Sequence, residues 1–232
     1  MIALRSRGGV LAAVIALALC SGCQVLMPRA EPLAQSALAA DFSSYRIARV
    51  GILPFTGRDL DDQSASRLQR SFQLELGRVM PYELIPLGPS DLEEVRRSDP
   101  YRRGRYHPRT ILEIAKRFRL DALLVGTVSQ LEPYPPQSLA LGLEMVASET
   151  GLTIWSSSVH LDAADAGVRA RLERWQSRQR TEGGKKESVQ LTLASPERFT
   201  RFAAWEVARS TLKGADASPQ QGSPRNAFAP HK

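Results

Sequence analysis

The chain has little cysteine: two among 232 residues, Cys20 and Cys23, both near its start. Everything after Cys23 lacks a thiol, which excludes a disulfide, a cysteine nucleophile and a cysteine-rich zinc site from that part. No apolar run reaches the roughly 20 residues that a transmembrane helix needs. With 43% hydrophobic and 24% charged residues, the composition is that of a globular protein, and the length predicts one domain with extensions.

Acidic residues are outnumbered, and the formal net charge is +7. Residues 1–22 contain Arg5 and Arg7 and no acid, so the rest of the chain keeps a smaller basic excess. Such an excess suits an anionic envelope surface. Ordinary use of arginine in a soluble protein explains it equally well.

The first 22 residues have the pattern of a signal peptide. Val10–Leu19 is an apolar run too short to span a bilayer, and it follows a short basic segment. The next residues, Cys20-Ser21-Gly22-Cys23, resemble the lipobox of bacterial lipoproteins, although Cys20 stands where leucine is usual. The resemblance implies a signal peptide over 1–22 and a membrane anchor of acyl chains on Cys23.

Two alternatives to a lipid anchor remain open: an ordinary secretory leader cut near Gly22, or an uncleaved anchor. Gln24 follows the lipid site, where an aspartate would signal retention in the inner membrane of a Gram-negative cell. The resemblance therefore implies a periplasm-facing location at the outer membrane.

Four segments follow the leader. Residues 23–44 are rich in Ala, Pro and Ser and are interpreted as a lipidated tether. Residues 45–213 form the predicted envelope domain, in which 159–194 is an insertion containing an amphipathic helix. Residues 214–232 contain three prolines and few core-forming side chains, which predicts a disordered tail.

Apolar periodicity predicts the elements of this domain. Short apolar runs predict strands over 48–55, 82–87 and 121–131, and alternation over 137–148 before the turn Glu149-Thr150-Gly151 predicts a hairpin with 152–158. Helical spacing predicts helices over 64–79, 90–98, 108–119, 163–180 and 196–212. The predicted fold class is α/β (α+β): a single mixed sheet with a C-terminal antiparallel hairpin and helices packed on it.

Three short motifs connect this series of elements with a known superfamily. They are Ile52-Leu53-Pro54-Phe55, Val125-Gly126-Thr127, and a turn with Thr150 and Gly151 followed by Trp155. They resemble motifs of the envelope domains found in the curli-secretion lipoprotein CsgG, the N-terminal domain of TolB and the lipoprotein activators of penicillin-binding proteins. The resemblance implies a non-catalytic lipoprotein that binds other proteins or assembles a machine for secretion or cell-wall synthesis.

An arginine cluster is the first candidate site. Its members share a stretch of fourteen residues: Arg96, Arg97, Arg102, Arg103, Arg105 and Arg109. Lipid headgroups, other envelope anions or an acidic protein could bind there, whereas an exported chain rarely meets nucleic acid. A solvated loop without a ligand is the alternative.

An apolar stripe is the second candidate site. Val168, Leu172 and Trp175 follow helical spacing among many arginines. The stripe could dock on a membrane surface or in a partner's groove. Alternatively, it packs on the domain's own sheet.

No motif predicts a catalytic residue, a metal site or a cofactor. Asp59, Asp61 and Asp62 could hold magnesium, but more simply they cap the next helix. His160 and Asp162 could form a weak metal pair, but a solvent-exposed histidine is the simpler reading. We therefore expect no enzyme but a membrane-anchored module with envelope-protein partners. The alternatives are a homo-oligomeric ring component of an envelope complex and a cell-wall enzyme.

Overall fold

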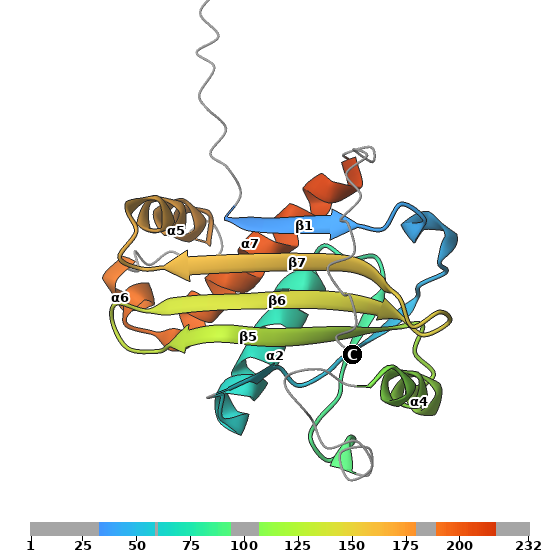
Figure 1. The fold of residues 1–232 in the computed structure, drawn as a ribbon. Coiled ribbons are helices and arrows are strands. Elements are labelled where there is room, and N and C mark those ends of the chain that lie inside the picture. Colours follow the sequence, from blue (N-terminus) through green and yellow to red (C-terminus); the bar gives the residue numbers. More distant parts are fainter. Residues whose placement is uncertain (1–32, 59, 94–106, 180–188, 217–232) are drawn as a thin grey trace, which may run out of the picture. The chain divides into compact units, whose positions relative to one another are not determined.

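The structure is a computed structural model and describes residues 33–58, 60–93, 107–179 and 189–216 (Figure 1). Its elements, in chain order, are β1 (Ala34–Leu38), the 3₁₀ turn η1 (Phe42–Ser44), β2 (Arg49–Ile52), β3 (Thr56–Gly57), α2 (Asp62–Leu76), β4 (Glu83–Pro86), α4 (Pro108–Phe118), β5 (Ala122–Glu132), β6 (Ser138–Ala147), β7 (Thr153–Asp162), α5 (Ala166–Gln179), α6 (Val189–Leu193) and α7 (Pro196–Asp216). Within these ranges, no helix is both long and apolar enough to cross a membrane.

The seven strands of the described residues belong to one mixed sheet, ordered β1-β7-β6-β5-β2-β4, with β3 paired to β5. The β5, β6, β7 and β1 strands are antiparallel neighbours, whereas β2 is parallel to both β5 and β4. The predicted fold class and the β6–β7 hairpin are confirmed. Gly151 closes that hairpin with a φ of +70°, a conformation that glycine adopts without steric cost.

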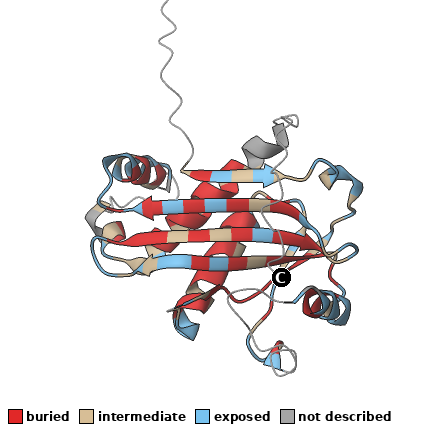
Figure 2. Ribbon diagram, in the orientation of Figure 1, coloured by how far each residue is buried: buried red, intermediate tan, exposed pale blue. Residues whose placement is uncertain are grey.

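The two faces of the sheet are covered unequally. The main core lies beneath α2 and α7, which cross one face (Figure 1). A smaller cluster lies on the opposite face, where Ile111 and Ile114 of α4 pack over Leu123 of β5 and Val146 of β6. The remainder of this second face carries partly buried and exposed residues that alternate with core residues along the strands (Figure 2).

Two of the sequence motifs meet in the core. Phe55, from the first motif, is 3% exposed and lies against Gly126, from the second. A Cβ atom added to Gly126 would come within 2.5 Å of Cδ1 and Cε1 of the Phe55 ring. Thr56 fixes the same approach, since its Oγ1 donates a hydrogen bond to the Gly126 carbonyl at 3.1 Å. The absence of a side chain at Gly126 is therefore a packing requirement.

The tether predicted over 23–44 is wrong in its second half. Residues 34–38 form β1, an edge strand that pairs with β7 from Ala34 opposite Val159 to Leu38 opposite Trp155. Strand propensity is weak in this stretch of Ala, Gln and Ser, so tertiary pairing decides its conformation. Small side chains allow β1 to lie close to α7, and Ser36 Oγ lies 2.6 Å from Ser210 Oγ of that helix.

The amphipathic helix predicted within the 159–194 insertion is present as α5, but the first residues of that segment belong to the sheet. The β7 strand continues through Leu161 in register with β6, and α5 contributes buried side chains to the main core. The last helix runs to Asp216, beyond the predicted domain end at 213. Most of the helix expected over 90–98, and residues 217–232 of the expected tail, lie outside the described residues.

Candidate functional site

Six of the ten residues assigned to the lipid anchor, the arginine cluster and the apolar stripe lie outside the described ranges. These are Cys23 and five of the six clustered arginines: Arg96, Arg97, Arg102, Arg103 and Arg105. Arg109 is described and is exposed in the first turn of α4. Its backbone N–H donates to Nδ1 of His107, the N-cap residue of that helix, at 3.4 Å.

The apolar stripe of α5 is not a free surface. Val168, Leu172 and Trp175 are 4%, 0% and 5% exposed and belong to the main core. The Trp175 ring lies 5.7 Å from that of Phe202 in α7, measured between centroids. Intramolecular packing, the alternative that the sequence left open, therefore accounts for these three side chains.

Asp61 is the N-cap residue of α2 and Asp62 lies in its first turn, as the simpler interpretation expected, whereas Asp59 lies outside the described residues. Asp61 Oδ1 accepts a hydrogen bond from the Ser64 N–H at 2.8 Å, and its Oδ2 accepts one from Ser64 Oγ at 2.7 Å. These hydrogen bonds to the carboxylate lower the pKa of Asp61. His160 is exposed on β7, and the described residues contain no group of three His, Cys, Asp or Glu side chains placed to bind a metal.

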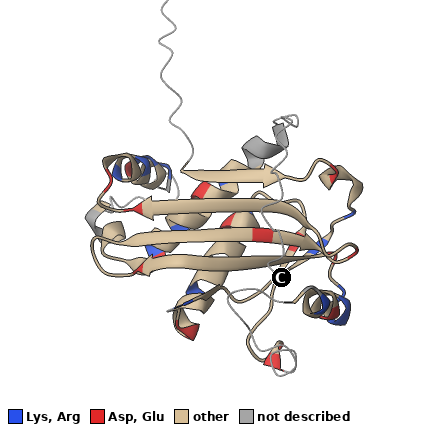
Figure 3. Ribbon diagram, in the orientation of Figure 1, with Lys and Arg blue, Asp and Glu red and all other residues tan. Residues whose placement is uncertain are grey.

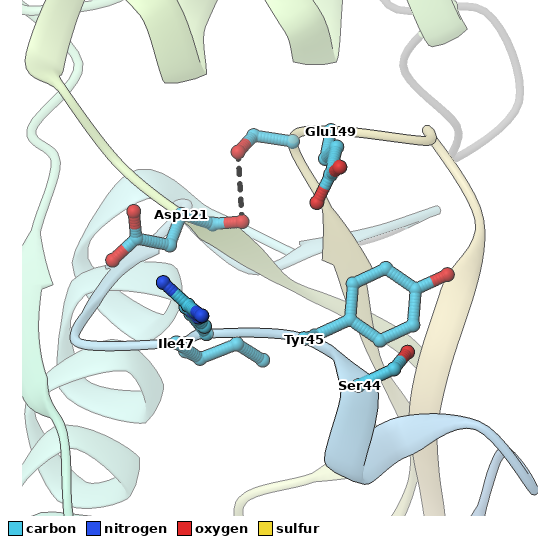
Figure 4. A pocket seen from close by; sticks show the side chains of 7 residues that line it. Ser44, Tyr45, Ile47, Asp121 and Glu149 are labelled. Atoms are coloured by element: carbon cyan, nitrogen blue, oxygen red, sulfur yellow. Dashed lines mark hydrogen bonds between the residues drawn. The ribbon is translucent and has the colours of Figure 1, made fainter.

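A polar hollow of about 280 Å³ lies at the corner where β5 begins and β6 turns into β7 (Figure 4). Its walls come from Ser44, Tyr45, Arg46, Ile47, Asp121, Ser148 and Glu149. Asp121 joins the surrounding segments: Oδ2 accepts from the Ala48 and Arg49 N–H groups, both at 2.9 Å, and its backbone carbonyl accepts from Ser148 Oγ at 2.8 Å. The Asp121 carboxylate is thus used in holding the loop before β2 to the start of β5.

Two other polar side chains of the same hollow, those of Tyr45 and Ser148, are engaged in contacts within the fold. The Tyr45 hydroxyl lies 3.3 Å from Thr150 Oγ1, so it is engaged with the β6–β7 turn. A catalytic pair needs a nucleophile within hydrogen-bond reach of a base that a third group orients. Among the described residues of this corner, Ser148 instead donates to a backbone carbonyl.

The uncovered part of the sheet is a broader candidate, which we call the open face. It consists of the outward side chains of four strands: Gln35 and Ala37 of β1; Ser156, Ser158 and His160 of β7; Ala140, Gly142 and Glu144 of β6; and Val125, Thr127 and Gln130 of β5. All are partly or fully exposed. A shallow hollow of about 410 Å³ lies on it around Gly142, where an added Cβ would meet nothing within 4 Å.

Charge on the open face is sparse and of one sign. Glu144 is its one acidic side chain within the rows just named, and Glu132 and Asp162 lie at the strand ends on either side of Ser138. The strands are accordingly almost entirely tan in Figure 3, the colour of residues that are neither acidic nor basic. The alternation over 137–148 contained the signal for this face, because small residues stand between the buried leucines.

Several basic side chains lie on the helices of the covered face. Arg171 of α5 forms an ion pair with Glu206 of α7, with Nε 3.2 Å from Oε1, and Glu75 of α2 pairs with Arg78 and Arg201. Two further arginines lie against the indole of Trp205: the guanidinium carbons of Arg209 and Arg178 are 4.6 and 5.9 Å from the ring centroid. Sequence reasoning missed this cluster because the two helices come together only in the folded chain.

Comparisons with known proteins show no family for this chain. The sequence matches no protein-family model and no curated protein sequence. Similar solved structures include the PelC dodecamer from Paraburkholderia phytofirmans, with 10% identity, a TM-score of 0.41, and coverage of 75% of this chain and 93% of that one. The lipoprotein GNA1162 from Neisseria meningitidis has 17% identity, a TM-score of 0.40, and coverage of 60% and 99%.

The C-terminal domain of LpoB from Escherichia coli is a third such structure. It has 14% identity and a TM-score of 0.36, and the match covers 54% of this chain and 96% of that domain. All three TM-scores are below 0.5, so these similarities assign neither a family nor a function to the chain.

Proposed function

We propose that the chain is a lipoprotein of the bacterial cell envelope, anchored through Cys23 at the outer membrane, that works as a non-catalytic binding or assembly module. The leader pattern supports the anchor. The open face supports the binding role, and we take it as the surface for a protein partner.

The observation that carries this proposal is the composition of the open face. The solvated face of an antiparallel sheet is usually polar, and protein surfaces in general are rich in Lys, Arg, Glu and Asp. Here the central row across four strands is Gln35, Ser158, Gly142 and Thr127, which are uncharged, and two of them are very small. Depletion of charged side chains is one of the features that distinguish the centre of a protein interface from the rest of the surface.

The small side chains also lower the cost of binding. They have few rotamers to lose when a partner covers them, and the antiparallel strands behind them are already fixed by pairing on both sides in β6 and β7. A partner can therefore approach the backbone of this sheet closely without reordering it.

Site-directed crosslinking in living cells tests the binding surface. A photoreactive residue at Ser158, exposed at the centre of the open face, should yield adducts with specific envelope proteins, which mass spectrometry identifies. The same residue at Gln63, exposed on α2, is the control and should yield none of these adducts. Ser158→Arg should abolish the adducts seen from a probe at Gly142 and leave the unfolding midpoint unchanged. Adducts that are equal at Ser158 and Gln63 would contradict a partner on this face.

Metabolic labelling with a radioactive fatty acid tests the anchor separately. Label should enter the wild-type protein and Cys20→Ser, but not Cys23→Ser. Label that is lost in Cys20→Ser and kept in Cys23→Ser would assign the anchor to Cys20 instead. That result would not test the open face.

A further inference from the structure

We infer that Arg178, Trp205 and Arg209 form a docking patch for the anionic phospholipid headgroups of the membrane that holds the chain. This inference rests on the proposed lipid anchor at Cys23. It adds a second, reversible contact made by the folded domain itself.

The patch is a fixed arrangement on two helices. Trp205 and Arg209 are one turn apart on the same side of α7, and Arg178 reaches the indole from α5. The core holds the Trp205 ring in place, because this ring stacks on that of Phe202 with 6.2 Å between the two centroids. Stacked guanidinium groups keep their N–H edges free to donate to an anion.

Positive charge is in surplus at this place. Of the charged groups that act on Arg209, two are the guanidinium groups of Arg171 and Arg178, and one is the carboxylate of Glu206. That carboxylate is already 3.2 Å from Arg171. Partial burial lowers the pKa of Arg209, Glu206 opposes this change, and the charges of Arg171 and Arg178 lower the pKa further. Among the described residues, no hydrogen bond or ion pair joins Arg178 or Arg209 to an acceptor, so an external anion would relieve this repulsion.

The covalent distance to the anchor favours a membrane as the source of that anion. Ten residue steps separate Cys23 from Leu33, where the described fold begins, and a fully extended chain covers at most about 35 Å over that number. The chain enters the fold at β1, whose Ser36 lies against Ser210, the neighbour of Arg209 in sequence. The headgroups therefore stay within reach of the patch, at a high local concentration.

The chemistry of the patch matches such a surface. Tryptophan is enriched at the level of the headgroups, where an apolar ring with a polar edge is stable, and each arginine near an anionic leaflet strengthens binding about fivefold. An acidic protein would satisfy the charges too, but it would not be held beside them by the tether.

Vesicle sedimentation tests the patch with the processed chain 23–232 carrying Cys23→Ser, so that no acyl chain contributes. Binding is expected to vesicles of phosphatidylethanolamine with phosphatidylglycerol, to weaken with added salt, and to be absent from pure phosphatidylcholine. Arg178→Ala/Arg209→Ala should weaken binding about 30-fold, since two arginines are removed. Arg178→Lys/Arg209→Lys should retain most of it.

The matched control is Arg58→Ala/Arg70→Ala, which removes two exposed arginines far along the chain from the patch. It should reduce binding much less, and circular dichroism should show that all variants remain folded. Equal losses in the two alanine pairs, or no sedimentation with anionic vesicles, would overturn the patch while leaving the fatty-acid labelling of Cys23 unaffected. Failure of labelling with intact vesicle binding would instead remove the anchor and keep the patch.

Discussion

The contact between Gly126 and Phe55 yields a quantitative test of the fold. An alanine in a strand normally stabilises a protein relative to glycine by about 0.4–1 kcal/mol, because it restricts the unfolded chain. At Gly126 the new Cβ would lie 2.5 Å from two ring carbons of Phe55, against the roughly 3.5–4.0 Å of an unstrained carbon contact. The ring cannot retreat freely, since it packs 5.1 Å from Phe72 between centroids. We therefore expect Gly126→Ala to destabilise the protein by about 1–3 kcal/mol.

Chemical denaturation of a double-mutant cycle measures this strain. Phe55→Leu removes ring atoms from the contact, so Gly126→Ala should cost little in that background, and the two changes should be coupled by at least about 1 kcal/mol. Gly142→Ala is the matched control on the neighbouring strand, where the added Cβ meets nothing within 4 Å. It should stabilise by about 0.4–1 kcal/mol. Additive effects in the cycle, or equal responses at Gly126 and Gly142, would refute the reasoning.

Three further predictions concern ionisable side chains. Arg171→Met should lower the free energy of unfolding in urea by about 3–5 kcal/mol, because it removes the ion pair of Glu206, whose side chain is 2% exposed, whereas Arg171→Met/Glu206→Leu should cost less. The folded-state pKa of Asp61 lies below its ordinary value of 3.8, so the cap stabilises the fold fully above pH 3.8 and loses this effect as the pH falls through the folded-state pKa. The difference in Tm between wild type and Asp61→Ala should therefore shrink as the pH falls from 3.8 through that pKa. Burial raises the pKa of Tyr82 to about 12, so stability should decline between pH 10 and about 12 as the unfolded state ionises first, and Tyr82→Phe should remove this decline.

Strong periodic patterns predicted the central elements from sequence. The alternating leucines of residues 137–148 give β6, and the spacing of Leu68, Phe72 and Leu76 gives the buried side of α2. Both patterns arise because one side of the element faces the core, and that burial shapes the sequence directly. The N-cap at Asp61 was predictable for the same reason, as a local hydrogen bond of nearby residues.

The parts that sequence reasoning missed depend on contacts between distant residues. β1 is recognisable only through its pairing with β7, more than a hundred residues later, since Ala34 and Ser36 carry little strand propensity themselves. The apolar stripe on α5 could either bind an external surface or pack within the domain, and its contact with Phe202 shows that it packs within the domain. The cluster at Trp205 likewise requires α5 and α7 to be adjacent, which periodicity in either helix does not encode.

The pairing of the first strand with the last also determines how the domain would bear a mechanical load. A pull on the chain ahead of Leu33 enters the fold through β1, whose five residues are all in register with β7. When the pull is directed along the strand, the interstrand hydrogen bonds are sheared together rather than opened one after another. The side-chain contacts of Ser36 with Ser157 and Ser210 add a further link to β7 and a link to α7. Force applied ahead of Leu33 would thus be distributed into the sheet and α7 before β1 could detach.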